Sequence, residues 1–368
     1  MKQMFLQQQE HLDDFRRKYW KKLHEFGEQC DDPLPQPAKR CRRISQVELD
    51  RACKMLAESV GPDTPPRTWE ELTAICALKD WSFLLETQTF DSFLCGFLEL
   101  VWGCAGELHV DRHYRLRQAQ TNGLATYQAL LLLRLLLEQG IVPKHSTLEA
   151  SAFGRRFSAA RDGRPEGGRE WAFARHWYST FVDVLTAKID GSYAWQPGSA
   201  DLEIAPLPCS LQHYLQTEDK RRATLGVSCW GEWHFTVLRG TENEALAIEF
   251  LNNLMSSQKI TERALRCAAL PTVNAFYEIY KDSACLSLPE RADLSLPRMT
   301  YGELRQRIFR RARSRADLFD YRHCMRELHG LLERLLNTPD TPASGVGQEL
   351  IATLGRIKQF EDRELLLH

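Results

Sequence analysis

The spacing of apolar residues predicts a mainly α-helical protein whose centre lies near residue 130. The stretch LATYQALLLLRLLLEQG, within a predicted helix over 114–139, carries apolar side chains on nearly every side and closes at Gly140. A helix of a soluble protein that is apolar all round is surrounded by other helices. Residues 81–101 are rich in Trp, Phe and Leu with few charges, so we expect this segment to lie near the centre too.

Local start signals predict several further helices. A Ser or Thr followed three residues later by Glu forms a capping box, and this pattern occurs at Ser45–Glu48, Thr68–Glu71 and Thr300–Glu303. Gly or Pro residues follow several of the segments and favour their termination. The additional helices are predicted over 45–60, 68–78, 170–189, 258–281, 304–315, 321–337 and 348–366.

After residue 190 the pattern changes to alternation of apolar and polar side chains. The segments ATLGVSCWG, EWHFTVLRG and EALAIEFL predict three strands, which Gly231 and the Gly240–Asn243 turn separate. A three-stranded meander needs a covering layer, which neighbouring helices can supply. The predicted fold is therefore mainly α: a helical bundle, a smaller α+β unit with a short antiparallel sheet at about 190–255, and a helical C-terminus. The predicted domain boundaries place the helical bundle at 45–160, the α+β unit at 170–290 and the helical C-terminal region at 300–368. Before them lie an amphipathic helix, 1–30, and a basic Pro-rich linker, 31–44.

The first thirty residues predict one amphipathic helix. Apolar side chains recur at steps of three and four residues over 5–26 and share one face, while Gln, Lys, Arg and Glu occupy the others. This face packs on the next domain, binds a protein partner or pairs in a coiled coil. The coiled coil is the weaker alternative because fewer than four heptads are present, and the oligomeric state stays open.

A basic segment follows within the Pro-rich linker 31–44. Its cations are Lys39, Arg40, Arg42 and Arg43. Short basic clusters on extended segments are recognised by import receptors or by polyanions, so nuclear import is predicted, with a solvated linker as the alternative. Ser45 fits a basophilic phosphorylation pattern, and it also fits the first position of the next helix.

Composition narrows the class of protein. The formal net charge is −1, so no global field draws the chain to nucleic acid or to a membrane. The longest apolar run, Leu130–Leu137, is broken by Arg134 and is far shorter than the ~20 residues of a membrane span. The eleven cysteines are odd in number and form no C-x-x-C pair, and the N-terminus lacks a signal-peptide pattern. These features predict a soluble, intracellular protein with reduced thiols.

An arginine-rich segment is the strongest charged feature. Guanidinium groups bind phosphates and carboxylates bidentately, so this predicted helix either contacts a polyanion such as nucleic acid or pairs with acidic side chains of its neighbours. Its arginines are Arg305, Arg307, Arg310, Arg311, Arg313 and Arg315.

Signatures of cofactors and metals are lacking in the sequence. His109 and His113 are four residues apart, but spacing identifies no third ligand, so no metal is predicted. There is also no Gly-rich phosphate loop, nucleophile elbow or EF-hand pattern, and no cofactor is predicted.

His234, Asn252 and Cys285 follow one another in the order that a thiol nucleophile and its base require. His234 begins a predicted strand, Asn252 follows the next one, and Cys285 comes later. With the upstream segments WYSTFVDVLTAKIDGSYAW and LEIAPL, residues 170–290 resemble the ubiquitin-like-protein-specific cysteine peptidases. The resemblance implies that His234 accepts the thiol proton, that Asn252 orients the histidine and that Cys285 is the nucleophile.

The sequence departs from that family at its reactive positions. Phe235 follows the histidine where the family has Trp, and Cys285 lies in KDSACLS without the family's Gly or upstream Gln. The leading interpretation is therefore a non-catalytic nuclear protein that binds protein partners through helical surfaces, including helix 5–26. A divergent, inactive or active, cysteine peptidase and a nucleic-acid-contacting factor are the alternatives, and cytoplasm is the alternative location.

Overall fold

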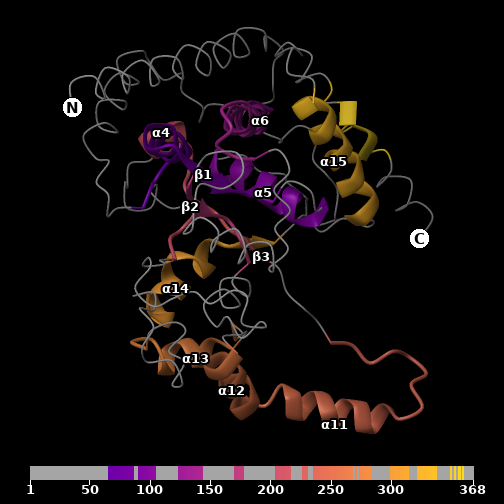
Figure 1. Ribbon diagram of the computed structural model, residues 1–368. Helices are drawn as coiled ribbons and strands as arrows, with labels where there is room; N and C mark the ends of the chain where they lie inside the picture. Colours follow the sequence, from indigo (N-terminus) through magenta and orange to yellow (C-terminus); the bar gives the residue numbers. More distant parts are fainter. Residues whose placement is uncertain are drawn as a thin grey trace.

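The computed structural model is mainly helical, in agreement with the predicted class (Figure 1). Two small sheets, each of two parallel strands, complete its described part. The residues that the structure describes are 65–86, 90–104, 123–143, 170–177, 204–216, 226–230, 235–267, 270–271, 273–283, 299–314, 321–337, 349, 352–353, 355–357 and 359.

Helix α4 (Trp69–Lys79) begins where the sequence predicts. The Thr68 side chain accepts a hydrogen bond from the Glu71 backbone amide, which satisfies one of the amide groups left unpaired at a helix start. Asp80 ends the helix in the left-handed conformation, with φ of 57°. A short polar side chain tolerates this conformation better than most residues do.

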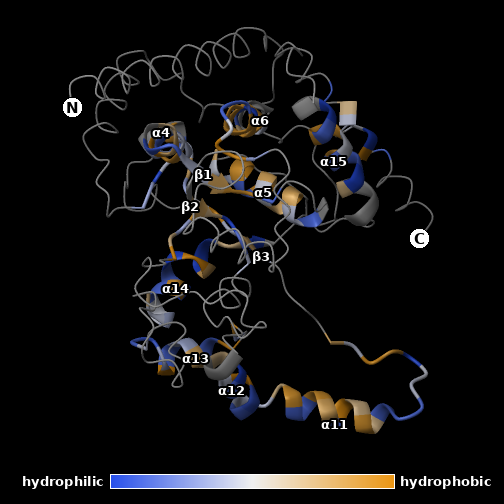
Figure 2. Cartoon of the chain, viewed as in Figure 1, coloured by the Kyte–Doolittle hydropathy of each residue, from blue (hydrophilic) through white to orange (hydrophobic). Residues whose placement is uncertain are grey.

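Helices α5 (Phe90–Gly103) and α6 (Gly123–Glu138) form the centre of the larger core. Leu132, Leu133 and Leu136 of α6 are completely buried, so the predicted central position of this helix is confirmed. Figure 2 shows both helices dominated by hydrophobic colour. Gly140 then closes α6 with a positive φ of 64°.

Strands β1 (Trp81–Leu84) and β2 (Glu170–Ala174) pair in parallel beside this core. The helix predicted over 170–189 is therefore wrong where it overlaps β2. Asp80 turns the chain out of α4, and the following apolar residues are covered on both sides as strand β1. The pairing continues past β2, because the Arg175 amide donates to the Leu84 carbonyl at 2.9 Å. Such non-local pairing is not visible in a local hydrophobic pattern.

Helix α15 (Tyr321–Asn337) matches its predicted range and packs on α5. His329 meets the edge of Phe93, with ring centroids 5.7 Å apart. Leu331 and Leu332 are completely buried in the same core as α4, α5 and α6. The C-terminal part of the chain thus completes the core that residues 69–142 begin.

A second core is formed by helices α12 (Ser257–Cys267), α13 (Asn274–Ile279) and α14 (Tyr301–Arg307). Its centre is aromatic: Phe276 lies edge-on to Tyr301, with centroids 5.0 Å apart. The predicted capping box at the start of α14 is confirmed, since the Thr300 and Glu303 side chains bond reciprocally to backbone amides. In Figure 1 this group lies below the core built around α5 and α6.

Strand β3 (Cys229–Trp230) pairs in parallel with β4 (Arg313–Ser314), so the predicted antiparallel sheet is not formed by the described residues. The Arg313 amide donates to the Ser228 carbonyl at 2.9 Å. Gly226, just before β3, packs against the carbonyls of Leu207 and Pro208 so closely that a Cβ would collide with them. The short helix α9 (Leu211–Gln216) begins three residues after Pro208.

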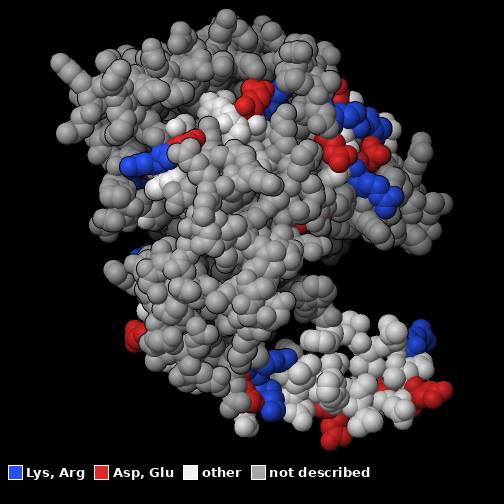
Figure 3. Space-filling model, viewed as in Figure 1, with Lys and Arg blue, Asp and Glu red and all other residues white. Residues whose placement is uncertain are grey.

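Helix α11 (Glu244–Leu254) contains no buried residue, although EALAIEFL predicts a core strand. Ala and Leu favour a helix, and Ile248 is the single β-branched residue of the segment, which explains the wrong prediction. Phe250 is 63% exposed and Leu246 is 64% exposed. Figure 1 shows α11 extending away from the other helices, and Figure 3 shows a mostly uncharged surface there.

None of the helices in the described part of the chain combines the length and apolarity that crossing a membrane requires.

Candidate functional site

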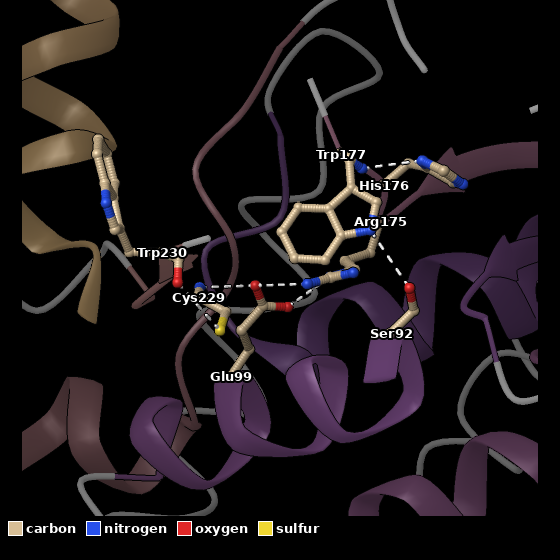
Figure 4. Close-up of polar contacts among 7 residues, drawn as sticks. All are labelled: Ser92, Glu99, Arg175, His176, Trp177, Cys229 and Trp230. Carbon is tan, nitrogen blue, oxygen red and sulfur yellow. Dashed lines mark hydrogen bonds and ion pairs between the residues drawn. The ribbon is translucent and has the colours of Figure 1, made fainter. Parts of the chain in front are cut away.

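A buried carboxylate–guanidinium pair joins three elements at the edge of the larger core (Figure 4). Glu99 lies on α5, and Arg175 directly follows β2. The Arg175 Nε and Nη2 atoms donate to the two Glu99 carboxylate oxygens at 2.6 and 3.0 Å. Both side chains are almost fully buried. This bidentate geometry fixes the guanidinium plane, since two parallel hydrogen bonds define its orientation.

Strand β3 is attached to the same carboxylate. The Cys229 backbone amide donates to Glu99 Oε1 at 2.8 Å. One carboxylate thus organises the end of β2 and the start of β3, two segments that are more than 50 residues apart in the sequence. A buried charge that makes several hydrogen bonds is far less unfavourable than an unpaired one.

The indole of Trp177 covers the guanidinium. The Arg175 Cζ atom lies 4.9 Å from the centroid of the Trp177 ring, within the range of a cation–π contact. The indole nitrogen donates to Ser92 Oγ at 3.3 Å, and the Trp177 amide donates to His176 Nδ1 at 2.9 Å. Trp177 and His176 are half-buried, so the site presents an aromatic surface supported by fixed polar groups.

Trp230 provides a second half-buried indole on β3. Its ring meets the edge of Phe309 with centroids 5.3 Å apart. In Figure 4, Trp230 points away from Glu99, on the opposite side of β3. The strand therefore connects the Glu99–Arg175 pair to η5 (Phe309–Arg311), the 3-10 helix that follows α14.

Two opposing effects act on the pKa of the Arg175 guanidinium. Burial disfavours its charged form, but the charge and hydrogen bonds of Glu99 outweigh burial and raise the pKa of Arg175 above its usual value. The guanidinium is consequently charged at every physiological pH, and Trp177 covers a permanent cation. The group cannot act as a general acid or base.

Three of the described thiols, those of Cys104, Cys209 and Cys229, are poorly suited to nucleophilic chemistry. Burial raises the pKa of Cys104 and, with the nearby Glu70 carboxylate, raises that of Cys209 to about 12. A side-chain hydrogen bond with Cys95, together with burial, raises the pKa of Cys229. Because the thiolate is the reactive form, these cysteines are unreactive in the folded protein.

Of the three predicted peptidase residues, Asn252 belongs to the part of the chain that the structure describes. Asn252 lies on the exposed helix α11, where no strand precedes it. His234 and Cys285 lie outside the described residues. The Phe235 side chain, which follows His234 in the predicted strand, is 60% exposed.

The arginine-rich segment is divided among three elements and not continuous in one helix. Helix α14 ends at Arg307, Phe309–Arg311 forms η5, and Arg313 belongs to β4. Arg305 pairs with Glu278, and Arg307 contacts Glu303 at 3.0 Å, so two of the guanidinium groups have acidic partners.

Arg310 and Arg313 are exposed, whereas Arg311 is half-buried. The remaining residue of that predicted polyanion site, Arg315, lies outside the described residues. So do helix 5–26, the residue Ser45 and the basic cluster Lys39, Arg40, Arg42 and Arg43. Across the described ranges, no three His, Cys, Asp or Glu side chains are grouped as metal ligands.

Comparison with solved structures relates this chain to the sugar-binding protein MalE from Xanthomonas citri, with a TM-score of 0.56 and 16% identity. That match covers 85% of this chain and 68% of MalE. An ABC transporter solute-binding protein from Thermotoga lettingae, solved with bound α-D-tagatose, has a TM-score of 0.54 and 15% identity, with 84% and 68% coverage. No family model matches the sequence.

A third solved structure has the same kind of fold. The GacH receptor of Streptomyces glaucescens, solved unliganded and with acarbose, has a TM-score of 0.52 and 15% identity. Its match covers 82% of this chain and 67% of the receptor. At this level of identity the likeness concerns the fold alone.

These structures correct the predicted resemblance to ubiquitin-like-protein-specific cysteine peptidases, because the proteins of similar fold are solute-binding proteins. They also overturn the interpretation as a nuclear adaptor that binds protein partners through helical surfaces. The nuclear location, its cytoplasmic alternative and the nucleic-acid contact are corrected by the same comparison. They rested on local charge patterns, cysteine spacing and the N-terminal sequence, none of which determines a fold.

Sequence patterns missed the Glu99–Arg175–Trp177 site. The paired residues are 76 positions apart, and the helix predicted over 170–189 placed Arg175 on the wrong kind of element. One signal was available: Glu99 is an acidic residue within the very apolar segment 90–103, where a buried carboxylate requires a cationic or hydrogen-bonding partner.

Proposed function

We propose that this chain is a non-catalytic solute-binding protein that holds a carbohydrate beside Trp177. The observation that carries the proposal is the half-buried indole stacked over a guanidinium that Glu99 holds in one plane. The fold shared with solved sugar-binding proteins supports it.

The chemistry of the site suits a neutral, polyhydroxylated ligand. A sugar ring has an apolar C–H face that packs on an aromatic ring, and hydroxyl groups that accept or donate hydrogen bonds. Small-molecule sites combine apolar and aromatic surfaces with a few oriented polar groups. Trp177 would supply the aromatic surface, and the buried Arg175 guanidinium would fix the orientation of the indole through its cation–π contact. A half-buried indole also brings a large contact area with little conformational freedom to lose.

Binding without reaction fits the groups of the site. The Arg175 guanidinium stays protonated, and the described thiols with raised pKa values are poor nucleophiles. Glu99 makes three hydrogen bonds to Arg175 and to the Cys229 amide, which occupy its oxygens. The Glu99–Arg175 pair would therefore orient the site and would not attack a bound ligand.

The two hydrophobic cores support a two-unit arrangement for this function. The predicted division near residue 170 is retained as part of the proposal, with the helical residues 45–160 and the unit 170–290 meeting at the site. The core of α4, α5 and α6 also contains Met325, Leu328 and Leu331. In this proposal the region 300–368 contributes to both units. Its helix α14 packs in the second core, and its helix α15 packs in the larger core.

Isothermal titration calorimetry with maltose, α-D-tagatose and acarbose tests the proposal. We expect saturable binding of at least one of them, and a loss of about tenfold or more in affinity for Trp177→Ala, since an aromatic contact contributes about 0.5–1.5 kcal/mol beyond its buried area. Trp177→Phe retains a ring and should bind within a few-fold of the unaltered chain.

Phe250→Ala is the matched control, because it removes an aromatic ring that is 63% exposed on α11, away from the site. Its affinity should equal that of the unaltered chain. The proposal fails if none of the three sugars binds, or if Trp177→Ala and Phe250→Ala reduce affinity equally.

A further inference from the structure

Two buried cysteines from distant parts of the chain meet beside the candidate site. Cys95 lies on α5 and is completely buried, and Cys229 lies on β3 and is 8% exposed. Both belong to one small hydrophobic cluster with Leu98 and Trp102. Their thiol groups are joined by a side-chain hydrogen bond, and neither cysteine forms a disulfide in this structure.

The backbone around the two thiols is held in place by the Glu99 carboxylate. Cys95 and Glu99 are four residues apart on α5, so they share one face of the helix. Glu99 Oε1 accepts a hydrogen bond from the Cys229 amide at 2.8 Å, which fixes β3 against that face. The sulfur atoms are therefore positioned by a fixed contact and not by the chance approach of two surface side chains.

We propose that Cys95 and Cys229 form a disulfide when the chain folds in the presence of a disulfide oxidant such as glutathione disulfide. The two thiols lose two protons and two electrons and form one S–S bond. One glutathione disulfide accepts them and becomes two glutathione molecules. The bond would tie α5 to β3 and hold the strand that carries Trp230, a property additional to sugar binding.

Burial determines when this bond forms. In the folded, reduced chain the thiols are shielded from solvent, and the raised pKa of Cys229 disfavours the thiolate that attacks a disulfide. Oxidation of the folded protein is therefore slow. During refolding the same thiols are accessible, and the formation of the α5–β3 contact then brings them together.

A neighbouring pair of cysteines provides an internal control. Cys104 follows α5, and the Ser210 amide next to Cys209 donates to the Gly103 carbonyl at 2.8 Å. The Cys209 thiol is directed to the Arg67 carbonyl at 3.6 Å, much as the Cys229 thiol is directed to the Trp230 carbonyl at 3.9 Å. The two pairs differ in the thiol on α5 or just after it: the Cys104 thiol bonds to the Ser210 side chain, whereas the Cys95 thiol bonds to Cys229. We expect no disulfide between Cys104 and Cys209.

The experiment is refolding of the full chain in a glutathione redox buffer, alkylation of the remaining thiols, and mass spectrometry of the tryptic peptides. Cleavage after Lys and Arg places Cys95 and Cys104 in peptide 80–112, Cys209 in 189–220 and Cys229 in 223–239. We expect peptide 80–112 linked to 223–239, two hydrogens lighter than the sum of the separate peptides. Cys95→Ala should abolish this linked species, whereas Cys104→Ala should leave it unchanged.

A comparison within the unaltered chain covers the case in which Cys95→Ala fails to fold. The refolded oxidised chain should have a higher midpoint of urea denaturation than the same sample after reduction, because the bond restricts the unfolded chain. The proposal is overturned if peptide 223–239 remains alkylated, if 80–112 links to 189–220 in its place, or if reduction leaves the midpoint unchanged.

Discussion

Helices α6 and α11 are both rich in Leu and Ala, yet they occupy opposite environments. Leu132 and Leu133 of α6 are completely buried between other helices, whereas α11 contains no buried side chain. The composition of a helix thus determines how much apolar surface it has, but the rest of the chain determines whether that surface is covered. Most of the stability of such a helix comes from packing of its apolar surface.

A carboxylate introduced into each helix should distinguish their environments most strongly. Leu132→Asp places an unpaired carboxylate in the larger core, at a free-energy cost comparable to the whole stability of about 5–15 kcal/mol. We expect no cooperative unfolding transition in circular dichroism for this variant. Leu246→Asp alters a side chain that is 64% exposed and should retain the transition of the unaltered chain. A folded Leu132→Asp variant would contradict the central position of α6.

Buried and exposed positions should differ in the same way for ion pairs. Glu99→Gln leaves the Arg175 cation buried without its counter-charge, and we expect the free energy of unfolding to fall by about 3–5 kcal/mol in urea denaturation. Glu278→Gln removes the partner of Arg305 at an exposed position and should leave the unfolding midpoint unchanged within error. Equal effects of the two substitutions would show that the Glu99–Arg175 pair is not buried as described.

A smaller effect on the free energy of unfolding, which depends on pH, is expected from His213 on α9. Burial, and then the charge of Arg313, lower the pKa of this imidazole below its usual 6.5. The unfolded chain binds the proton more readily, so the stability contributed by neutral His213 is present above about pH 6.5 and is lost as pH falls through the lower, folded pKa.

This effect is isolated by comparing the unaltered chain with His213→Asn at a series of pH values. The difference in free energy of unfolding between the two should change below about pH 6.5, in the direction of a weaker unaltered chain. A difference that is constant from pH 7 to pH 5 would contradict the lowered pKa.

Local signals account for the successful sequence predictions. Thr68 and Thr300 begin helices at the predicted residues, and the all-round apolar pattern near residue 130 marks the buried helix α6. Each of these depends on side chains within one or two helical turns of each other. The range of α15 was predicted for the same reason, since its apolar positions repeat along one face.

The site could not be predicted because its contacts join distant segments. The Arg175 guanidinium acquires its partner through the parallel pairing of β1 with β2, and the Cys229 amide reaches Glu99 because β3 lies directly against α5. Strand preference depends on such neighbours more than helix preference does. In α11 the opposite occurred: an alternating pattern favoured a strand, but no partner strand covers Ile248, which is 44% exposed.

Hydrogen–deuterium exchange with and without a saturating sugar tests most directly whether the ligand lies beside Trp177. We expect slower exchange of the backbone amides in residues 173–177 and 227–230 when the sugar is bound, with the exchange of α11 unchanged. Slower exchange confined to α11 or to the second core, or no change anywhere with maltose, α-D-tagatose and acarbose, would contradict this expectation.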